Sequence, residues 1–73
     1  MNTRGLTRDL TKSDTPNAEF THVMVTTTAG SVIYVTSTGE QITLASVPVA
    51  EWIPVGRSTH VTTDSTAVGL MVV

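Results

Sequence analysis

The stretch Gly30-Ser-Val-Ile-Tyr-Val-Thr-Ser-Thr-Gly-Glu-Gln-Ile-Thr-Leu44 decides the fold, because two runs of β-branched and apolar residues flank a short polar segment. Branched and aromatic side chains suit the pleated surface of a sheet. Gly39 lies in the polar segment, where the lack of a Cβ allows the positive φ of a tight turn. The stretch therefore predicts a β-hairpin with its turn at residues 37–40.

Further short strands are expected on both sides of this hairpin. Residues Phe20–Thr28 alternate between two faces, with Val23 and Val25 on one of them. Pro48 lacks an N–H for a central ladder and therefore indicates a strand end. The remaining strands are predicted at residues 51–55, 60–63 and 67–73, with turns at 27–30, 56–58 and 64–66. About six short strands at roughly ten-residue spacing predict an all-β fold, a small antiparallel β-sandwich or jelly-roll-like barrel.

The first part of the chain differs from this body in composition. Leu6 and Leu10 are its only sizeable apolar side chains after the initial methionine, and Pro16 restricts the residue before it to extended backbone. We expect an extended N-terminal arm over residues 1–17 and a β-sandwich domain over residues 18–73. The arm is interpreted either as a disordered tail or as a segment that docks on a neighbouring subunit. In the second case its contacts are Arg4, Leu6, Arg8 and Leu10.

The small size of the chain predicts self-association. A domain of 73 residues buries a small core, and it has no cysteine for disulfides or thiolate zinc sites and only two histidines. An apolar final strand on such a chain lies either in the middle of the sheet or under another copy. Trp52 is interpreted as a cap on the core or as an anchor of a subunit contact. The predicted oligomer interface of the body is Trp52, Pro54, Leu70, Met71, Val72 and Val73.

Charge and composition argue against several classes of function. From residue 18 onward four acidic residues stand against Arg57 alone, and the chain has three aromatic residues, so we expect no nucleic-acid binding. No run reaches the roughly 18 to 20 apolar residues of a membrane-spanning helix, so we expect a soluble protein made in the cytoplasm. His22 and His60 lie among Thr and Val, so we interpret them as half-buried residues of the sheet and not as catalytic bases or metal ligands. We expect no enzyme activity, no cofactor and no metal.

A series of short motifs runs in a fixed order from residue 10 to the last residue. It comprises Leu10-Thr-Lys-Ser-Asp14, Ala29-Gly30 before Val32, Tyr34 and Val35, Gly39 with Ile42-Thr-Leu44, Val49 with Trp52-Ile-Pro-Val55, Arg57, Val61, and Thr62-Thr-Asp-Ser-Thr-Ala67 before Gly69-Leu-Met-Val72. This series resembles the head spike base proteins of phages and gene-transfer agents. Two departures concern the end of the chain. Members of the family usually show Gly-Thr-Thr-Ala where this chain has Asp64-Ser-Thr-Ala67, and they often end on an aromatic residue rather than on two valines.

The resemblance implies a structural virion protein on the outer capsid surface of a bacteriophage, made in the cytoplasm of a bacterial host. It implies a homo-oligomer, a pentamer at the vertices or alternatively a trimer, in contact with the major capsid protein. The interface residues predicted for the arm and the body would then bind either the capsid surface or the next subunit. The subunit would carry a spike fibre protein or simply decorate the shell. The alternatives are a cement, tail or head-completion protein, and a small β-barrel that binds a peptide or glycan.

Overall fold

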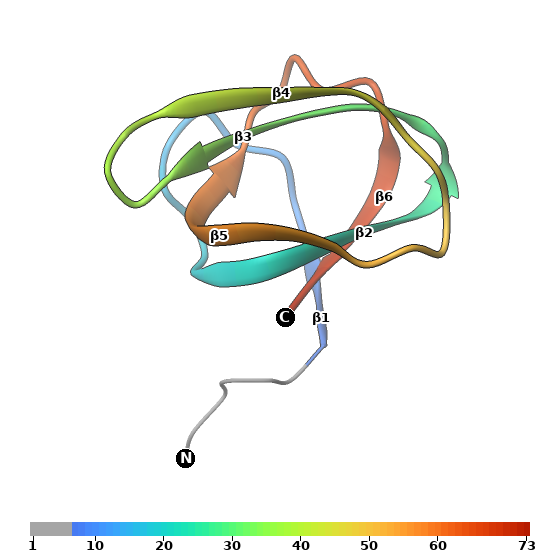
Figure 1. Cartoon of the computed structure of the whole chain (residues 1–73), viewed down its shortest axis with the longest axis horizontal. Helices are drawn as coiled ribbons and strands as arrows, with labels where there is room; N and C mark the ends of the chain where they lie inside the picture. The colour runs from blue at the N-terminus through green and yellow to red at the C-terminus, as the bar shows by residue number, and fades with distance from the viewer. Residues whose placement is uncertain (1–6) are drawn as a thin grey trace.

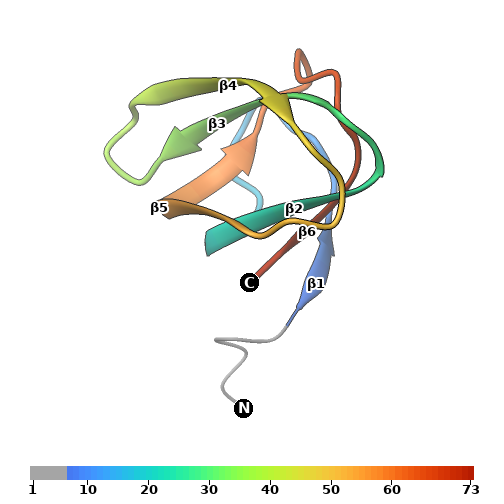
Figure 2. The ribbon, with the colours of Figure 1, turned by 45° about the vertical axis from the view of Figure 1, so that its right-hand side comes forward.

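The structure is a computed structural model that describes residues 7–73. Within them lie six strands, β1 (Arg8–Leu10), β2 (Phe20–Thr28), β3 (Gly30–Thr36), β4 (Gln41–Val47), β5 (Ile53–Val61) and β6 (Val68–Val72). They form one antiparallel sheet in the order β1-β6-β2-β5-β3-β4. The sheet curls so that its inner face encloses the core (Figures 1 and 2). The predicted small all-β fold of about six short antiparallel strands is confirmed.

The hairpin of β3 and β4 forms where the sequence predicts it. Val32 lies opposite Leu44 and Tyr34 opposite Ile42 in the ladder. Gly39 has a φ of 88°, and its N–H donates to the Thr36 carbonyl at 2.9 Å. The turn thus depends on the backbone freedom of glycine, as its local sequence indicates.

The core consists of side chains that alternate along the inner face of the sheet. Its fully buried members come from four strands and from the loop before β6, so that no single hairpin contains the core. Burying an aliphatic side chain of this size contributes roughly 1.5–3 kcal/mol to the free energy of unfolding. The apolar residues without measurable exposure are Val23, Val25, Val32, Val61, Ala67 and Val72.

Strand β5 differs from the prediction of two strands separated by a turn at residues 56–58. It is continuous from Ile53 to Val61, and Gly56 adopts a φ of 72° within it. The ladder with β2 shifts register at this place, and the buried Ser58 hydroxyl donates to the Gly56 carbonyl at 3.1 Å. A glycine with positive φ thus bends the strand as a bulge and does not reverse it. The bend lets β5 pair with β2 in its first half and with β3 in its second half.

The described part of the predicted arm belongs to the sheet. Strand β1 pairs with β6, and Leu10, opposite Leu70, is 8% exposed and lies in the core. The following segment crosses to β5, where the N–H of Ser13 donates to the Val61 carbonyl at 2.8 Å. Lys12 Nζ donates to the Ser65 carbonyl at 2.7 Å. Residues 8–13 are therefore integral to the fold, and the prediction of an arm outside the core is wrong for Leu10.

The loop between β5 and β6 completes the pairing of β3. The N–H of Thr62 donates to the Ile33 carbonyl at 2.8 Å, and the N–H of Ala67 donates to the Ser31 carbonyl at 3.0 Å. Between these two contacts the Ile33 N–H donates to the Ser65 hydroxyl at 2.8 Å. The buried Ser65 side chain thus takes the place of a backbone carbonyl in the ladder.

Replacing Ser65 with alanine is expected to lower the free energy of unfolding by about 1–3 kcal/mol, because it leaves the Ile33 N–H without this acceptor. Urea unfolding followed by circular dichroism measures the change as a lower midpoint at constant slope. Ser46→Ala is the matched control, because Ser46 is exposed on β4 and its loss is expected to cost less than about 0.5 kcal/mol. Equal midpoints for the two variants would show that the Ser65 contact carries no stability.

Candidate interaction surface on the outer face of the sheet

The outer face of the sheet carries apolar side chains where β2 crosses β6. Met24 on β2 lies opposite Met71 on β6. The next pair in this ladder, Val25 and Leu70, is buried in the core. Successive side chains of a strand point to opposite faces, so Met24 and Met71 both face outward. Each is partly exposed.

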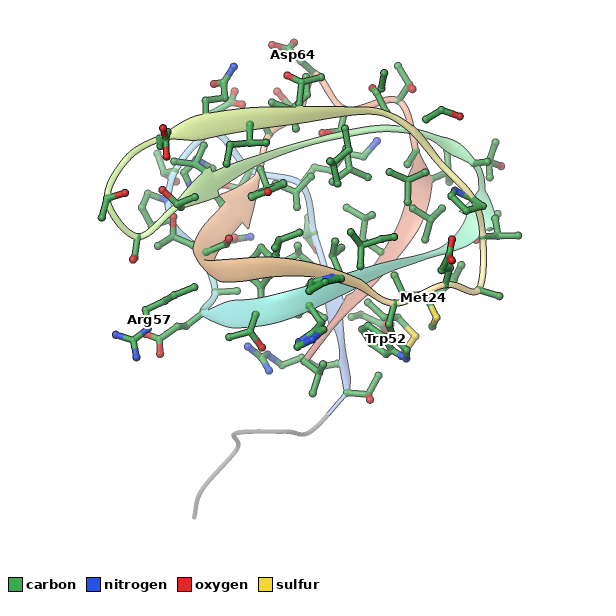
Figure 3. All side chains as sticks on the ribbon, viewed as in Figure 1. Met24, Trp52, Arg57 and Asp64 are labelled. Carbon is green, nitrogen blue, oxygen red and sulfur yellow. The ribbon has the colours of Figure 1, made fainter. Side chains whose placement is uncertain are left out.

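The start of β5 extends this surface. His22 lies opposite Pro54 and Val23 opposite Ile53, and the same register continued by one residue places Trp52 opposite Met24. Trp52 is 39% exposed. Figure 3 shows Trp52 and Met24 close together, in agreement with this register. We define the outer patch as Met24, Trp52, Pro54 and Met71.

The connection between β4 and β5 holds Trp52 in place. Val49 forms a parallel bridge with Val25 of β2, and the N–H of Ala50 donates to the Val25 carbonyl at 2.8 Å. Ala50 has a φ of 61°, a left-handed conformation that costs a residue with a Cβ roughly 1–2 kcal/mol. This turn directs the chain back across β2, so that Trp52 reaches the outer face. The connection is thus tied to the sheet two residues before the tryptophan.

The outer patch joins two methionines, a tryptophan and a proline, and the exposed Asp9 on β1 lies opposite Met71 at the edge of the patch. Methionine side chains are flexible and polarisable and adapt to the shape of a partner, whereas tryptophan supplies a large rigid contact area. Aromatic residues and methionine are enriched at the centres of protein interfaces, and charged residues are depleted there. The composition of the outer patch is therefore similar to that found at the centre of an interface.

The predicted interface residues divide between this patch and other places. Trp52, Pro54 and Met71 lie in the outer patch. Val73 is partly exposed, and its carbonyl accepts the Thr21 N–H at 2.9 Å. Met24 is absent from the predicted set, although the alternation of its strand already places it on the face opposite Val23 and Val25.

The structure corrects the assignment of Leu10, Leu70 and Val72. They are 8%, 4% and 0% exposed and pack in the core of their own chain, so their side chains do not line an outer surface. The final strand lies inside the sheet, between β1 and β2, and its inward-facing side chains pack in the core. Arg8 lies on β1 and donates to the Glu19 carbonyl. Arg4 and Leu6 lie outside the described residues.

Residues 7–73 contain no cluster of three or more His, Cys, Asp or Glu side chains that could hold a metal ion. In the same range there is no helix with the length and hydropathy to cross a membrane. No protein-family model, curated protein or solved structure matches the chain.

Proposed function

We propose that this chain is a structural virion protein, a capsid-surface spike base or decoration subunit that oligomerises and attaches to phage heads at their vertices. The observation that carries the proposal is the outer patch, an uncharged group of Met24, Trp52, Pro54 and Met71 on the outside of a small sheet. The order of motifs from residue 10 to residue 73, which resembles that of head spike base proteins, supports the same function.

The small size of the chain fits a protein whose function is to bind other protein subunits. A stable protein interface buries about 800 Å² on each partner. The accessible surface of the chain is 4322 Å², so one such contact engages close to a fifth of it. Within that area a buried tryptophan carries a large share of the binding energy. The outer patch would thus form the centre of one interface, with polar neighbours such as His22 and Thr21 at its rim.

The proposed partners are further copies of this chain and the major capsid protein. The oligomer would be a pentamer, which matches the symmetry of a capsid vertex, or alternatively a trimer. A spike fibre protein would bind the side of the oligomer that faces away from the shell. The protein would be made in the cytoplasm of the bacterial host and end on the outer surface of the capsid.

Replacing Trp52 with serine is expected to weaken binding to heads more than ten-fold while the β-sheet signal in circular dichroism stays unchanged. A central tryptophan contributes about 2 kcal/mol or more to an interface, and 1.4 kcal/mol corresponds to a factor of ten. Co-sedimentation with purified heads that lack this protein measures binding, and light scattering measures the oligomeric state. Thr38→Ala is the control, because Thr38 lies in the hairpin turn at the end of the molecule remote from the outer patch (Figures 1 and 3).

Two outcomes would count against the proposal. If the folded wild-type protein stays a monomer at micromolar concentration and does not sediment with heads, the chain is not a capsid subunit. If it binds a peptide or glycan as a monomer, the alternative of a small binding module replaces the proposal. Loss of head binding in both Trp52→Ser and Thr38→Ala would show that the outer patch is not the specific contact.

A further inference from the structure

Strand β4 forms an edge of the sheet. The strand order places β4 at one end and β1 at the other, and within residues 7–73 β4 pairs with β3 alone. The β4 edge is seven residues long, whereas β1 has three. An edge of this length presents a row of backbone N–H and C=O groups to any extended chain that reaches it.

The direction of these backbone groups follows from the hairpin. The N–H of Thr36 donates to the Glu40 carbonyl at 2.9 Å, and the Glu40 N–H donates to the Thr36 hydroxyl at 3.1 Å, so these two residues form a pair that faces across the hairpin. Such pairs alternate along an antiparallel ladder, so Ile42 and Leu44 also direct their backbone groups toward β3. The residues between them, Gln41 and Thr43, direct their groups outward, and the regular alternation ends at Leu44, where the ladder shifts register.

Nothing in the side chains of β4 protects this edge. Natural edge strands are commonly blocked by a lysine, an inward-pointing charge or a proline. The strand reads Gln-Ile-Thr-Leu-Ala-Ser-Val and contains neither a charged residue nor a proline. The nearest charges, Glu40 and Glu51, lie beyond its two ends. The edge is thus open to another strand of the same composition.

We propose that β4 pairs with β4 of a second copy, antiparallel, about a two-fold axis at Thr43. In this register the Thr43 residues of the two copies form one hydrogen-bonded pair, and Gln41 of each copy lies opposite Ala45 of the other. Ile42 meets Leu44 of the other copy on the inner face, where both side chains already pack against the core. The pairing therefore continues both the ladder and the apolar layer across the axis.

The charge of Glu40 favours antiparallel over parallel pairing of the two β4 strands. A parallel, in-register pair would place Glu40 next to Glu40 of the second copy, and like charges directly opposite each other destabilise a strand pair. The antiparallel register separates the two glutamates to opposite ends of the paired segment. A two-fold contact joins the same surface on both copies, so it does not by itself close a ring of five or three. It is distinct from the ring contacts of the proposed capsid subunit and does not depend on that function.

Charge exchange at Thr43 tests the pairing on the purified protein. Thr43 of one copy lies opposite Thr43 of the other copy across the axis. Thr43→Lys and Thr43→Glu therefore each place two like charges opposite each other. Each variant is expected to weaken dimerisation at least ten-fold, as measured by sedimentation velocity. An equimolar mixture of the two variants is expected to restore the dimer. Thr38→Lys, in the exposed hairpin turn, is the control and should dimerise like the wild type. A monomeric wild type at 100 μM, or unchanged dimerisation of both Thr43 variants, would overturn the proposal.

A cysteine at the same position gives an independent readout, because the chain has no cysteine of its own. The Cα atoms of a hydrogen-bonded antiparallel pair lie about 5.5 Å apart, within the roughly 4.4–6.8 Å span of a disulfide. Thr43→Cys is therefore expected to form a covalent dimer under mild oxidation, seen on a non-reducing gel, much faster than Thr38→Cys. Equal rates for the two variants would contradict an axis at Thr43. Head binding is measured separately, so failure of this pairing and failure of the capsid function are distinguishable.

Discussion

Replacing Gly30 with alanine is expected to destabilise the fold by roughly 3–5 kcal/mol, one of the largest effects of a single substitution in this protein. A domain of this size is stable by only about 5 kcal/mol or little more, so a substantial fraction of the variant is expected to be unfolded at room temperature. Thermal unfolding followed by circular dichroism measures the loss. The expected result is a transition that starts near room temperature.

The reason is the close approach of the β5–β6 loop to the start of β3. A Cβ on Gly30 would lie 2.7 Å from the backbone nitrogen of Ala67 and 2.9 Å from the backbone carbonyl carbon of Thr66. These backbone atoms are held in place, because the Ala67 N–H donates to the Ser31 carbonyl and the Ser31 N–H donates to the Thr66 hydroxyl at 2.8 Å. Room for the methyl group would require breaking the contacts that close this side of the sheet.

Gly39→Ala separates steric overlap from backbone strain. Gly39 has a φ of 88°, and a Cβ there would meet no atom within 4 Å. The expected cost is about 1–2 kcal/mol, which is the strain of a left-handed conformation in a residue with a Cβ. If Gly30→Ala proved no more destabilising than Gly39→Ala, the β5–β6 loop would be able to move away from the added methyl group. Its hydrogen bonds to Ser31 would then not hold it in place.

Local sequence was sufficient to predict the hairpin and β2. The alternation of Phe20–Thr28 and the glycine turn between β3 and β4 are properties of neighbouring residues, and the structure confirms both. The same reasoning failed at Gly56, because a glycine with positive φ serves either a turn or a bulge. Which of the two forms depends on whether the flanking residues pair with other strands, and β2 and β3 lie far from Gly56 in the sequence.

The outer patch, too, could be predicted only in part from local sequence. The apolar character of Trp52 and Met71 is evident in the sequence, and both were predicted to lie in an interface. Their grouping with Met24 depends on two ladder registers, β2 with β5 and β2 with β6, which no local pattern specifies. The final strand was predicted to lie in the middle of the sheet or under another copy, and β6 lies between β1 and β2. The assignment of Leu70 and Val72 to an interface was wrong, because no local pattern specifies which face of this strand turns toward the core.

Deleting residues 1–16 is expected to destabilise the protein by about 3 kcal/mol or more, whereas an arm outside the fold would be lost without effect. The deletion removes strand β1 and the Leu10 side chain from the core, and truncating a buried leucine alone costs about 2–5 kcal/mol. It also removes the contact of Lys12 with the Ser65 carbonyl and that of Asp14, which accepts the Thr63 hydroxyl at 2.9 Å. The midpoint of urea unfolding measures the total.

Two smaller changes locate the effect within the deleted segment. Leu10→Ala keeps every backbone contact of β1, so it isolates the apolar part and is expected to account for most of the loss. Deletion of residues 1–6 leaves β1 and all the described contacts in place and is expected to retain the full midpoint. A deletion of residues 1–16 that unfolds at the wild-type midpoint would show that β1 contributes nothing to the fold.

The short deletion also makes the proposed role of Arg4 and Leu6 testable without loss of the fold. A variant lacking residues 1–16 confounds attachment with unfolding, because a destabilised subunit fails to bind for either reason. A variant lacking residues 1–6 keeps the core and the outer patch, so weaker binding to heads would be due to the missing residues alone. Unchanged binding would assign attachment to the body of the protein, with Trp52 at its centre.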